Sequence, residues 1–178
     1  MSDREIICLI REQSTRRKAF EIIVDTYSSR LYWYIRHMVL SHDDANDLLQ
    51  NTFIKAWLHL DSFRAESKLS TWLYKIAINE TLTFLKQKNE TIYINDMEAE
   101  LENQLEGDPF FDGDKTSILL QKAIQRLPTK QRTIFNMKYF EEMKYEDIKD
   151  ILNTSVGALK ASYHIAVKKI EEYISNNN

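Results

Sequence analysis

Apolar side chains recur every three or four residues along most of the chain, and this spacing predicts amphipathic helices. The longest stretch covers residues 16–39. A second follows a polar break at residues 41–43, which offers helix caps, and runs to Leu60. A third begins near residue 70 and fades near residue 88, and a short leader covers residues 6–10. Together these segments predict one small helical bundle.

Two stretches lack this period. Residues 61–68 are rich in Ser, Glu, Arg and Lys, which predicts a loop between the second and third helices. Residues 91–115 hold one Lys against eight Asp and Glu, together with two Gly and one Pro, and are predicted to form a linker. The flanking segments are neutral to basic, so the net charge of -3 comes from the linker and does not argue against nucleic-acid binding.

Helical spacing returns at residues 118–127, and Pro128 then marks a break before a further helix. Two more helices, residues 145–152 and 156–173, are joined by a short polar turn, which resembles a helix-turn-helix. The sequence therefore predicts an all-α protein with two small helical domains joined by a flexible acidic linker. The predicted limits are residues 1–90, 91–115 and 116–178, with the helix-turn-helix in the last.

The second helix of this unit is predicted to enter the major groove of DNA. Ser155 is a suitable N-cap, and Gly157 has no side chain to block a phosphate. The packing face carries Leu159, Tyr163, Val167 and Ile170, which leaves another face for DNA. The predicted DNA-facing residues are Ser155, Gly157, Lys160, Ala161, His164 and Lys168. Helix, turn and helix also occur in bundles that bind no DNA, so this unit alone does not decide the function.

The composition bears on disulfides, metal sites and membrane segments. With three Gly and two Pro, helix breakers are scarce. The single Cys8 forms no internal disulfide and is expected to be a small buried or half-buried thiol, and four scattered His show no metal-ligand spacing. We expect no metal, no cofactor and no catalytic residue. No apolar run reaches the roughly 20 residues that span a bilayer, and the charged start is unlike a signal peptide, so a cytoplasmic location without membrane insertion is expected.

Several motifs, in a fixed order, carry a resemblance to a known family. They are DLLQNTFIKAW at residues 47–57, FR at 63–64, STWLYKIAIN at 70–79, LP at 127–128 with QR at 131–132, YEDI at 145–148 and SVGALK at 155–160. In this order they resemble the extracytoplasmic-function sigma factors of bacterial RNA polymerase, over about residues 15–172. The resemblance implies a non-enzymatic factor that binds core polymerase and directs promoter-specific initiation as an alternative stress or envelope-response factor.

The resemblance also implies which residues contact polymerase. The family docks its second helix on the clamp coiled coil of the beta-prime subunit. The residues that correspond here are Asp47, Leu48, Gln50, Asn51 and Ile54. Asn51 departs from the usual Glu, so one charged contact is missing or replaced.

The loop and the third helix correspond to the family's reader of the minus-ten element, which captures an extruded base from a single strand. The corresponding residues are Phe63, Arg64, Ser67, Lys68, Lys75, Asn79, Thr83 and Lys86. After Asn79 this chain has Glu80, where relatives often have Arg. Trp72 and Leu73 are expected to be core residues. The helix-turn-helix would read the minus-thirty-five element, and many relatives are held inactive by an anti-sigma partner.

Two other functions remain open at this level. A DNA-binding regulator that acts without polymerase would account for the helix-turn-helix, but it has no need of residues 47–57. A nuclease could use the acidic residues to hold a metal ion, although they lack a rigid framework. These residues are Asp96, Glu98, Glu100 and Glu102.

Overall fold

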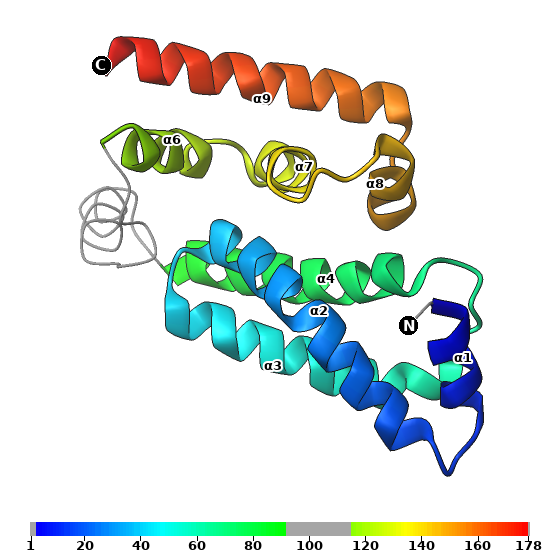
Figure 1. Ribbon diagram of the computed structural model, residues 1–178. Helices are drawn as coiled ribbons and strands as arrows, with labels where there is room; N and C mark the ends of the chain where they lie inside the picture. The colour runs from blue at the N-terminus through cyan, green and yellow to red at the C-terminus, as the bar shows by residue number, and fades with distance from the viewer. Residues whose placement is uncertain (1–2, 92–114, 178) are drawn as a thin grey trace.

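The computed structural model describes residues 3–91 and 115–177, and these residues form helices joined by short turns, with no strand among them (Figure 1). The all-α prediction is confirmed. The first part contains α1 (Asp3–Arg11), α2 (Arg16–Val39), α3 (His42–His59), the 3-10 helix η1 (Leu60–Ser62) and α4 (Leu69–Thr91). The second part contains α6 (Lys115–Gln125), α7 (Thr129–Tyr139), α8 (Tyr145–Leu152) and α9 (Val156–Asn176). The acidic linker lies outside the described residues.

An apolar core holds the first part together. Helix α2 packs against α1, α3 and α4, and α3 packs against α4. Ile23, Leu31 and Leu73 are fully buried among these helices, as periodic apolar positions require. Between α2 and α3 the chain turns at Leu40, a buried residue with a φ of 62°. The next helix starts cleanly because the Ser41 hydroxyl accepts a hydrogen bond from the Asp44 amide at 3.2 Å.

The second part is organised around α9. This helix packs against α6, α7 and α8, and a second apolar cluster includes Ile124, Phe135 and Ile170. The helix-turn-helix has the expected caps. Asn153 ends α8 in the left-handed conformation, and the Ser155 hydroxyl accepts a hydrogen bond from the Ala158 amide at 3.3 Å to begin α9.

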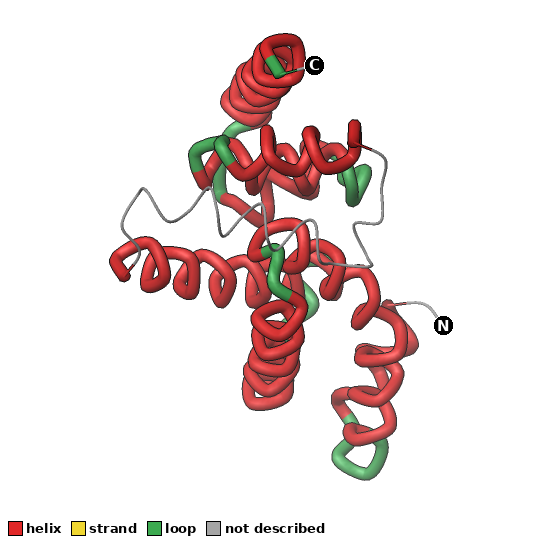
Figure 2. The backbone as a smooth tube through the Cα atoms, turned by 90° about the vertical axis from the view of Figure 1, so that its left-hand side faces the viewer, coloured by secondary structure: helices red, strands yellow, loops and turns green. Residues whose placement is uncertain are grey.

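The two parts pack against each other, α7 on α2 and α8 on α4. Figure 1 shows the second part stacked above the first, with α9 on the side away from the N-terminal bundle, and the rotated view in Figure 2 shows the same layers. Ile134, Met137 and Ile148 join the apolar cluster of the N-terminal part. The contact between the parts, which we call the seam, is therefore a buried surface.

One expectation about α1 is wrong. Cys8 is exposed, because Ile6 and Ile10 of the same helix face the core and a residue two positions from each lies on the opposite side.

Helices as long and as apolar as a bilayer crossing requires are absent from residues 3–91 and 115–177.

Candidate functional site

The predicted polymerase-binding residues lie on one exposed face of α3. Asp47, Gln50, Asn51 and Ile54 are all exposed, and Leu58, one turn further on, continues the face. The exposed fractions of Ile54 and Leu58 are 56% and 67%, which is high for large apolar side chains. We call these five residues the docking stripe. Sequence reasoning missed Leu58, although its position four residues after Ile54 was the available signal.

Leu48 does not belong to this surface. Its side chain is only 5% exposed and packs in the core with Ala45 and Ala56. A residue one position after Asp47 is rotated by about 100° around the helix axis, which turns it away from the stripe. Leu48 therefore lies outside the docking stripe, and its contact with polymerase stays a prediction.

Residues 61–68 form the loop predicted to capture single-stranded DNA, and we call this segment the minus-ten loop. The half-buried Phe63 ring packs on Trp72, with centroids 5.1 Å apart, whereas Arg64 is exposed. The backbone turns at Ala65, where φ is 59°. The loop is therefore fixed by an aromatic contact near its start and presents a cation at its tip.

The far end of the minus-ten loop contacts the helix-turn-helix. The Lys68 ammonium lies 2.6 Å from the Asp147 carboxylate of α8, and the hydroxyl of the half-buried Ser67 is turned to its own chain, 3.4 Å from the Lys68 carbonyl. The next residue, Leu69, is fully buried. One of the predicted DNA-binding cations is thus paired with a carboxylate from the other half of the molecule.

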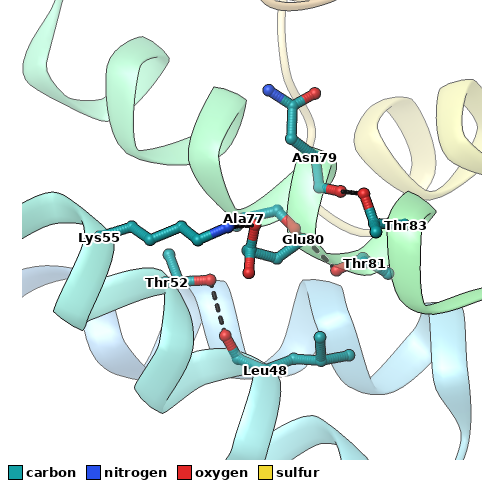
Figure 3. Close-up of polar contacts among 8 residues, drawn as sticks. All are labelled: Leu48, Thr52, Lys55, Ala77, Asn79, Glu80, Thr81 and Thr83. Carbon is teal, nitrogen blue, oxygen red and sulfur yellow. Dashed lines mark hydrogen bonds and ion pairs between the residues drawn. The ribbon is translucent and has the colours of Figure 1, made fainter.

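Along α4 the remaining predicted DNA contacts form an exposed row: Lys75, Asn79, Thr83 and Lys86. In Figure 3 the Asn79 amide points away from α3, and the Thr83 hydroxyl donates to the Asn79 carbonyl at 2.8 Å. The row combines two cations with an amide that has donors and acceptors for a base edge. Such a surface suits a nucleic-acid strand.

Figure 3 also shows the contacts of Glu80, the acidic residue after Asn79 that stands where relatives often have Arg. The Glu80 carboxylate points toward α3 and pairs with the Lys55 ammonium, and the Glu80 side chain is 15% exposed. Beneath this pair, the buried Thr52 and Thr81 donate to backbone carbonyls of their own helices. Glu80 therefore ties α4 to α3 and is not presented to a ligand.

On α9 the predicted division into two faces is confirmed. Leu159 and Ile170 are buried, whereas the face predicted to bind DNA is exposed at Lys160, Ala161, His164 and Lys168. The Lys160 ammonium lies 5.8 Å from the centre of the Tyr145 ring, which gives this cation an aromatic neighbour.

Gly157, in the first turn of α9, is exposed and has open space beside it. A Cβ atom built at this position would meet no atom of the described part of the chain within 4 Å. The fold itself therefore does not require a glycine here.

The seam contains buried polar groups that no local pattern indicated. The Glu141 carboxylate, from a side chain that is 7% exposed, accepts a hydrogen bond from the Tyr74 hydroxyl and lies 3.6 Å from Nε of Arg30. Elsewhere in the seam, the Gln125 amide donates to the His37 carbonyl at 3.0 Å. Through Glu141, the helices α2 and α4 are thus bonded to the turn between α7 and α8. Through Gln125, α2 is also bonded to α6.

Burial shifts the ionisation of several seam residues. The His37 ring stacks on Phe140 at 3.9 Å, and burial lowers the pKa of His37 to about 4. Burial also raises the pKa of the Tyr74 hydroxyl, with the Glu141 charge acting in the same direction. Both rings are therefore neutral at pH 7. Beside them lies a pocket of about 390 Å³ lined by Ser29, Arg30, Trp33, His37, Phe140, Glu141 and Glu142.

The described residues contain no cluster of His, Cys, Asp and Glu that could hold a metal ion. The acidic residues behind the nuclease alternative, Asp96 to Glu102, lie outside the described residues.

Comparisons with known proteins identify the family of this chain. Residues 23–91 match the family model for sigma-70 region 2, and residues 117–170 match that for sigma-70 region 4. The chain is 34% identical over 156 residues to the ECF RNA polymerase sigma factor SigW of Bacillus subtilis, covering 82% of this chain and 83% of that protein. It is 30% identical over 172 residues to the RNA polymerase sigma-H factor of Pseudomonas aeruginosa, covering 91% of this chain and 89% of that protein.

Solved structures share the fold. CnrH in complex with the cytosolic domain of CnrY matches with a TM-score of 0.74 and 19% identity, covering 99% of each chain. The sigma factor RpoE from Bartonella quintana, in complex with the anti-sigma factor NepR, matches with a TM-score of 0.70 and 24% identity over 90% of this chain and 99% of that one. The resemblance read from the sequence is confirmed, and the chain belongs to the extracytoplasmic-function sigma factors, which direct promoter-specific transcription.

Proposed function

We propose that this chain binds core RNA polymerase through the docking stripe of α3 and presents two surfaces to promoter DNA. The observation that carries the proposal is the stripe itself. Asp47, Gln50 and Asn51 lie beside the exposed apolar pair Ile54 and Leu58, and an apolar patch rimmed by polar residues is typical of a protein-binding surface. By resemblance, the partner is the clamp coiled coil of the beta-prime subunit.

The first DNA surface comprises the minus-ten loop and the exposed row of α4. The tip cation Arg64 would hold the phosphates of the non-template strand, and Phe63 with Ser67 would form walls for an extruded base. Asn79 would face the bases, between the cations of the row. Lys68 would join this surface after leaving Asp147. The complete proposed set is Phe63, Arg64, Ser67, Lys68, Lys75, Asn79, Thr83 and Lys86.

The second DNA surface is the exposed face of α9, which would enter the major groove at the minus-thirty-five element. Lys160 and His164 would face base edges, and Lys168 would contact a phosphate. The space beside Gly157 would let the backbone approach a phosphate closely. The complete proposed set is Ser155, Gly157, Lys160, Ala161, His164 and Lys168.

We infer that the chain has no enzymatic activity of its own and acts in the cytoplasm. We propose domain limits at residues 1–90, 91–115 and 116–178. The ends of the helices support them, because α4 ends at Thr91 and α6 begins at Lys115.

The seam suggests how the free chain is kept from promoters. While α7 and α8 stay packed on α2 and α4, the spacing between the two DNA surfaces is set by the chain itself. Polymerase would separate the halves so that both promoter elements are reached together. An anti-sigma factor is the second proposed partner, since the solved sigma factor RpoE is in complex with the anti-sigma factor NepR.

The proposal is tested by retention of the chain on immobilised core RNA polymerase. The parent chain should be retained, and the double variant Asp47→Arg with Gln50→Arg should be lost. The matched control is Gln13→Arg with Asp25→Arg, which changes the same residue types at exposed positions outside α3 and should be retained like the parent. A parent chain that is not retained, yet binds duplex DNA tightly and specifically alone, would instead be a regulator that acts without polymerase.

A further inference from the structure

One arginine at the start of α2 connects the end of the docking helix to the base of the minus-ten loop. Nη2 of Arg16 donates to the Trp57 carbonyl at 3.3 Å, and its Nη1 lies 2.7 Å from the Asp61 carboxylate. The guanidinium also lies over the Trp57 ring, 4.8 Å from its centre. The Arg16 side chain is only 24% exposed, so these contacts fix it in place.

These contacts lie where α3 ends and the loop begins. The Trp57 carbonyl accepts from the Leu60 amide that caps α3 and also from the Arg16 guanidinium. Because the C-terminal end of a helix carries partial negative charge, this cation stabilises the end of α3. Asp61 belongs to η1, the turn that follows directly. By bonding to both, Arg16 sets the direction in which the chain leaves α3.

The loop continues from this anchored turn. The Ser62 hydroxyl donates to the His59 carbonyl at 2.7 Å, and the next side chain, Phe63, packs on Trp72. Arg64 follows and is exposed. The position of the tip cation therefore depends on a base that Arg16 holds.

Leu58 of the docking stripe lies directly after Trp57 in the sequence. The Arg16 contacts thus lie between the surface proposed to bind polymerase and the loop proposed to capture DNA. A planar guanidinium can bond to a carbonyl and a carboxylate together while stacking on an indole, which an ammonium cannot do.

We propose that Arg16 is a positioning residue for promoter capture. It holds the base of the minus-ten loop in a fixed orientation to the docking helix, so that Phe63 and Arg64 are already placed when polymerase binds. Pre-organisation of this kind strengthens binding because less conformational freedom is lost on contact. The inference rests on the proposed function of the docking stripe and the loop.

The test uses the full chain assembled with core polymerase. The probe is a labelled single-stranded 20-nucleotide DNA pool in which six central positions are randomised. Two quantities are measured for each variant: the affinity for core polymerase, and the enrichment of preferred sequences in the bound DNA. Arg16→Met removes the polar contacts and keeps an apolar chain over Trp57. The matched control is Arg17→Met, because Arg17 is 89% exposed and pairs with Glu21, one turn further along its own helix.

Arg16→Met should leave polymerase affinity within about twofold of the parent and reduce the enrichment and the DNA affinity by about fivefold to tenfold, as expected for loss of a positioning contact. The enrichment and the DNA affinity of Arg16→Lys should lie between those of the parent and those of Arg16→Met. Arg17→Met should match the parent in both quantities. The charge reversal Arg16→Glu with Asp61→Arg should recover part of the enrichment that Arg16→Glu alone loses.

Each other outcome overturns the inference. Equal losses of polymerase affinity and DNA enrichment would show that Arg16 supports only the bundle, and unchanged enrichment in Arg16→Met would show that the loop needs no such anchor. If the parent fails to bind polymerase, the proposed function fails; if the parent binds and enriches DNA while Arg16→Met does the same, only the role of Arg16 fails.

Discussion

The interior of the N-terminal bundle and the seam between the two halves are both buried, yet they are built from different residues. The interior consists of side chains such as Ile23, Leu31 and Leu73, none of them measurably exposed. The seam adds polar groups to its apolar contacts, including Tyr74 and the Glu141 carboxylate. Similar burial is thus reached by two kinds of chemistry.

The difference bears on which of the two contacts would separate at the lower cost in free energy. Burial of an apolar side chain is favourable whatever apolar group it contacts, and exposing it to water again costs the same free energy. A buried carboxylate or amide regains hydrogen bonds to water when it is released, so separating a polar surface costs less than separating an apolar one of equal area. Interfaces between domains that move are accordingly more polar than cores.

The largest effect should come from the interior. Leu73→Ala is expected to lower the free energy of unfolding by about 2–5 kcal/mol, because it removes buried apolar surface and leaves a cavity. Urea denaturation followed by circular dichroism measures this. The matched control Leu58→Ala, at an exposed position, should change the value by less than about 0.5 kcal/mol. Equal losses for both variants would contradict the interior as described.

Glu141→Gln should weaken the seam and spare the bundle. It removes the charged partner of Arg30, and we expect the closed state to lose about 1–3 kcal/mol. Energy transfer between dyes on Cys8, which is exposed and is the chain's single cysteine, and on a second cysteine made by Ser175→Cys reports closure.

The control for this variant is Glu142→Gln, because Glu142 is the exposed neighbour in the same turn. It should leave the energy transfer unchanged. A Glu141→Gln chain that stays fully closed, or that unfolds in its N-terminal half, would remove the distinction between seam and interior.

Acidity should open the seam. In the closed state the pKa of His37 is about 4, below the ordinary value of 6.5, so protonation favours the open state, where the ring is hydrated. The free energy that favours the closed state should be unaffected above about pH 6.5. Below that value it should fall by at most about 1.4 kcal/mol for each pH unit, down to about pH 4.

The measurement is the same energy transfer at pH 7.5 and 5.5. Arg30, Arg36, Glu141 and Glu142 also lie near His37, so His37→Phe is the required control. It keeps a ring against Phe140 and should flatten the dependence on pH. A dependence that persists in His37→Phe would assign it to those charged groups instead.

The smallest effect should come from the exposed edge of the seam. Asp147→Asn removes the partner of Lys68, whose side chain is 62% exposed, and an exposed pair of this kind contributes about 0.2–1 kcal/mol. The shift in energy transfer should shrink further in high salt. Asp150→Asn, at an exposed position on the same helix, is the control. If Asp147→Asn destabilised the closed state as much as Glu141→Gln does, the exposed edge and not the buried carboxylate would hold the seam together.

Much of the fold could be predicted because the helical period is strong. Helix α2 covers residues 16–39 as predicted, and the helix-turn-helix has its predicted limits up to residue 173, with α9 running on to Asn176. The predicted and observed exposure differ where a single step around a helix matters, as at the buried Leu48 and the exposed Cys8. Apolarity predicts that a side chain is buried somewhere, and only the neighbouring helices decide which face is covered.

The site was predictable as a surface but not in its contacts. The period placed Asp47, Gln50 and Asn51 on one face. It carried no information on Lys68 with Asp147, or on Tyr74 with Glu141, because these partners lie 79 and 67 residues apart in the chain. Pairs at such separations follow from the packing of whole helices, which no local pattern specifies.

The open space beside Gly157 bears on how this protein would respond to selection. A glycine in a helix costs up to about 1 kcal/mol relative to alanine, and no atom of residues 3–91 and 115–177 would obstruct the added methyl group. Laboratory evolution that rewards heat resistance alone should therefore find Gly157→Ala early. Evolution that rewards transcription should keep the glycine, so the two selections would diverge at this one codon.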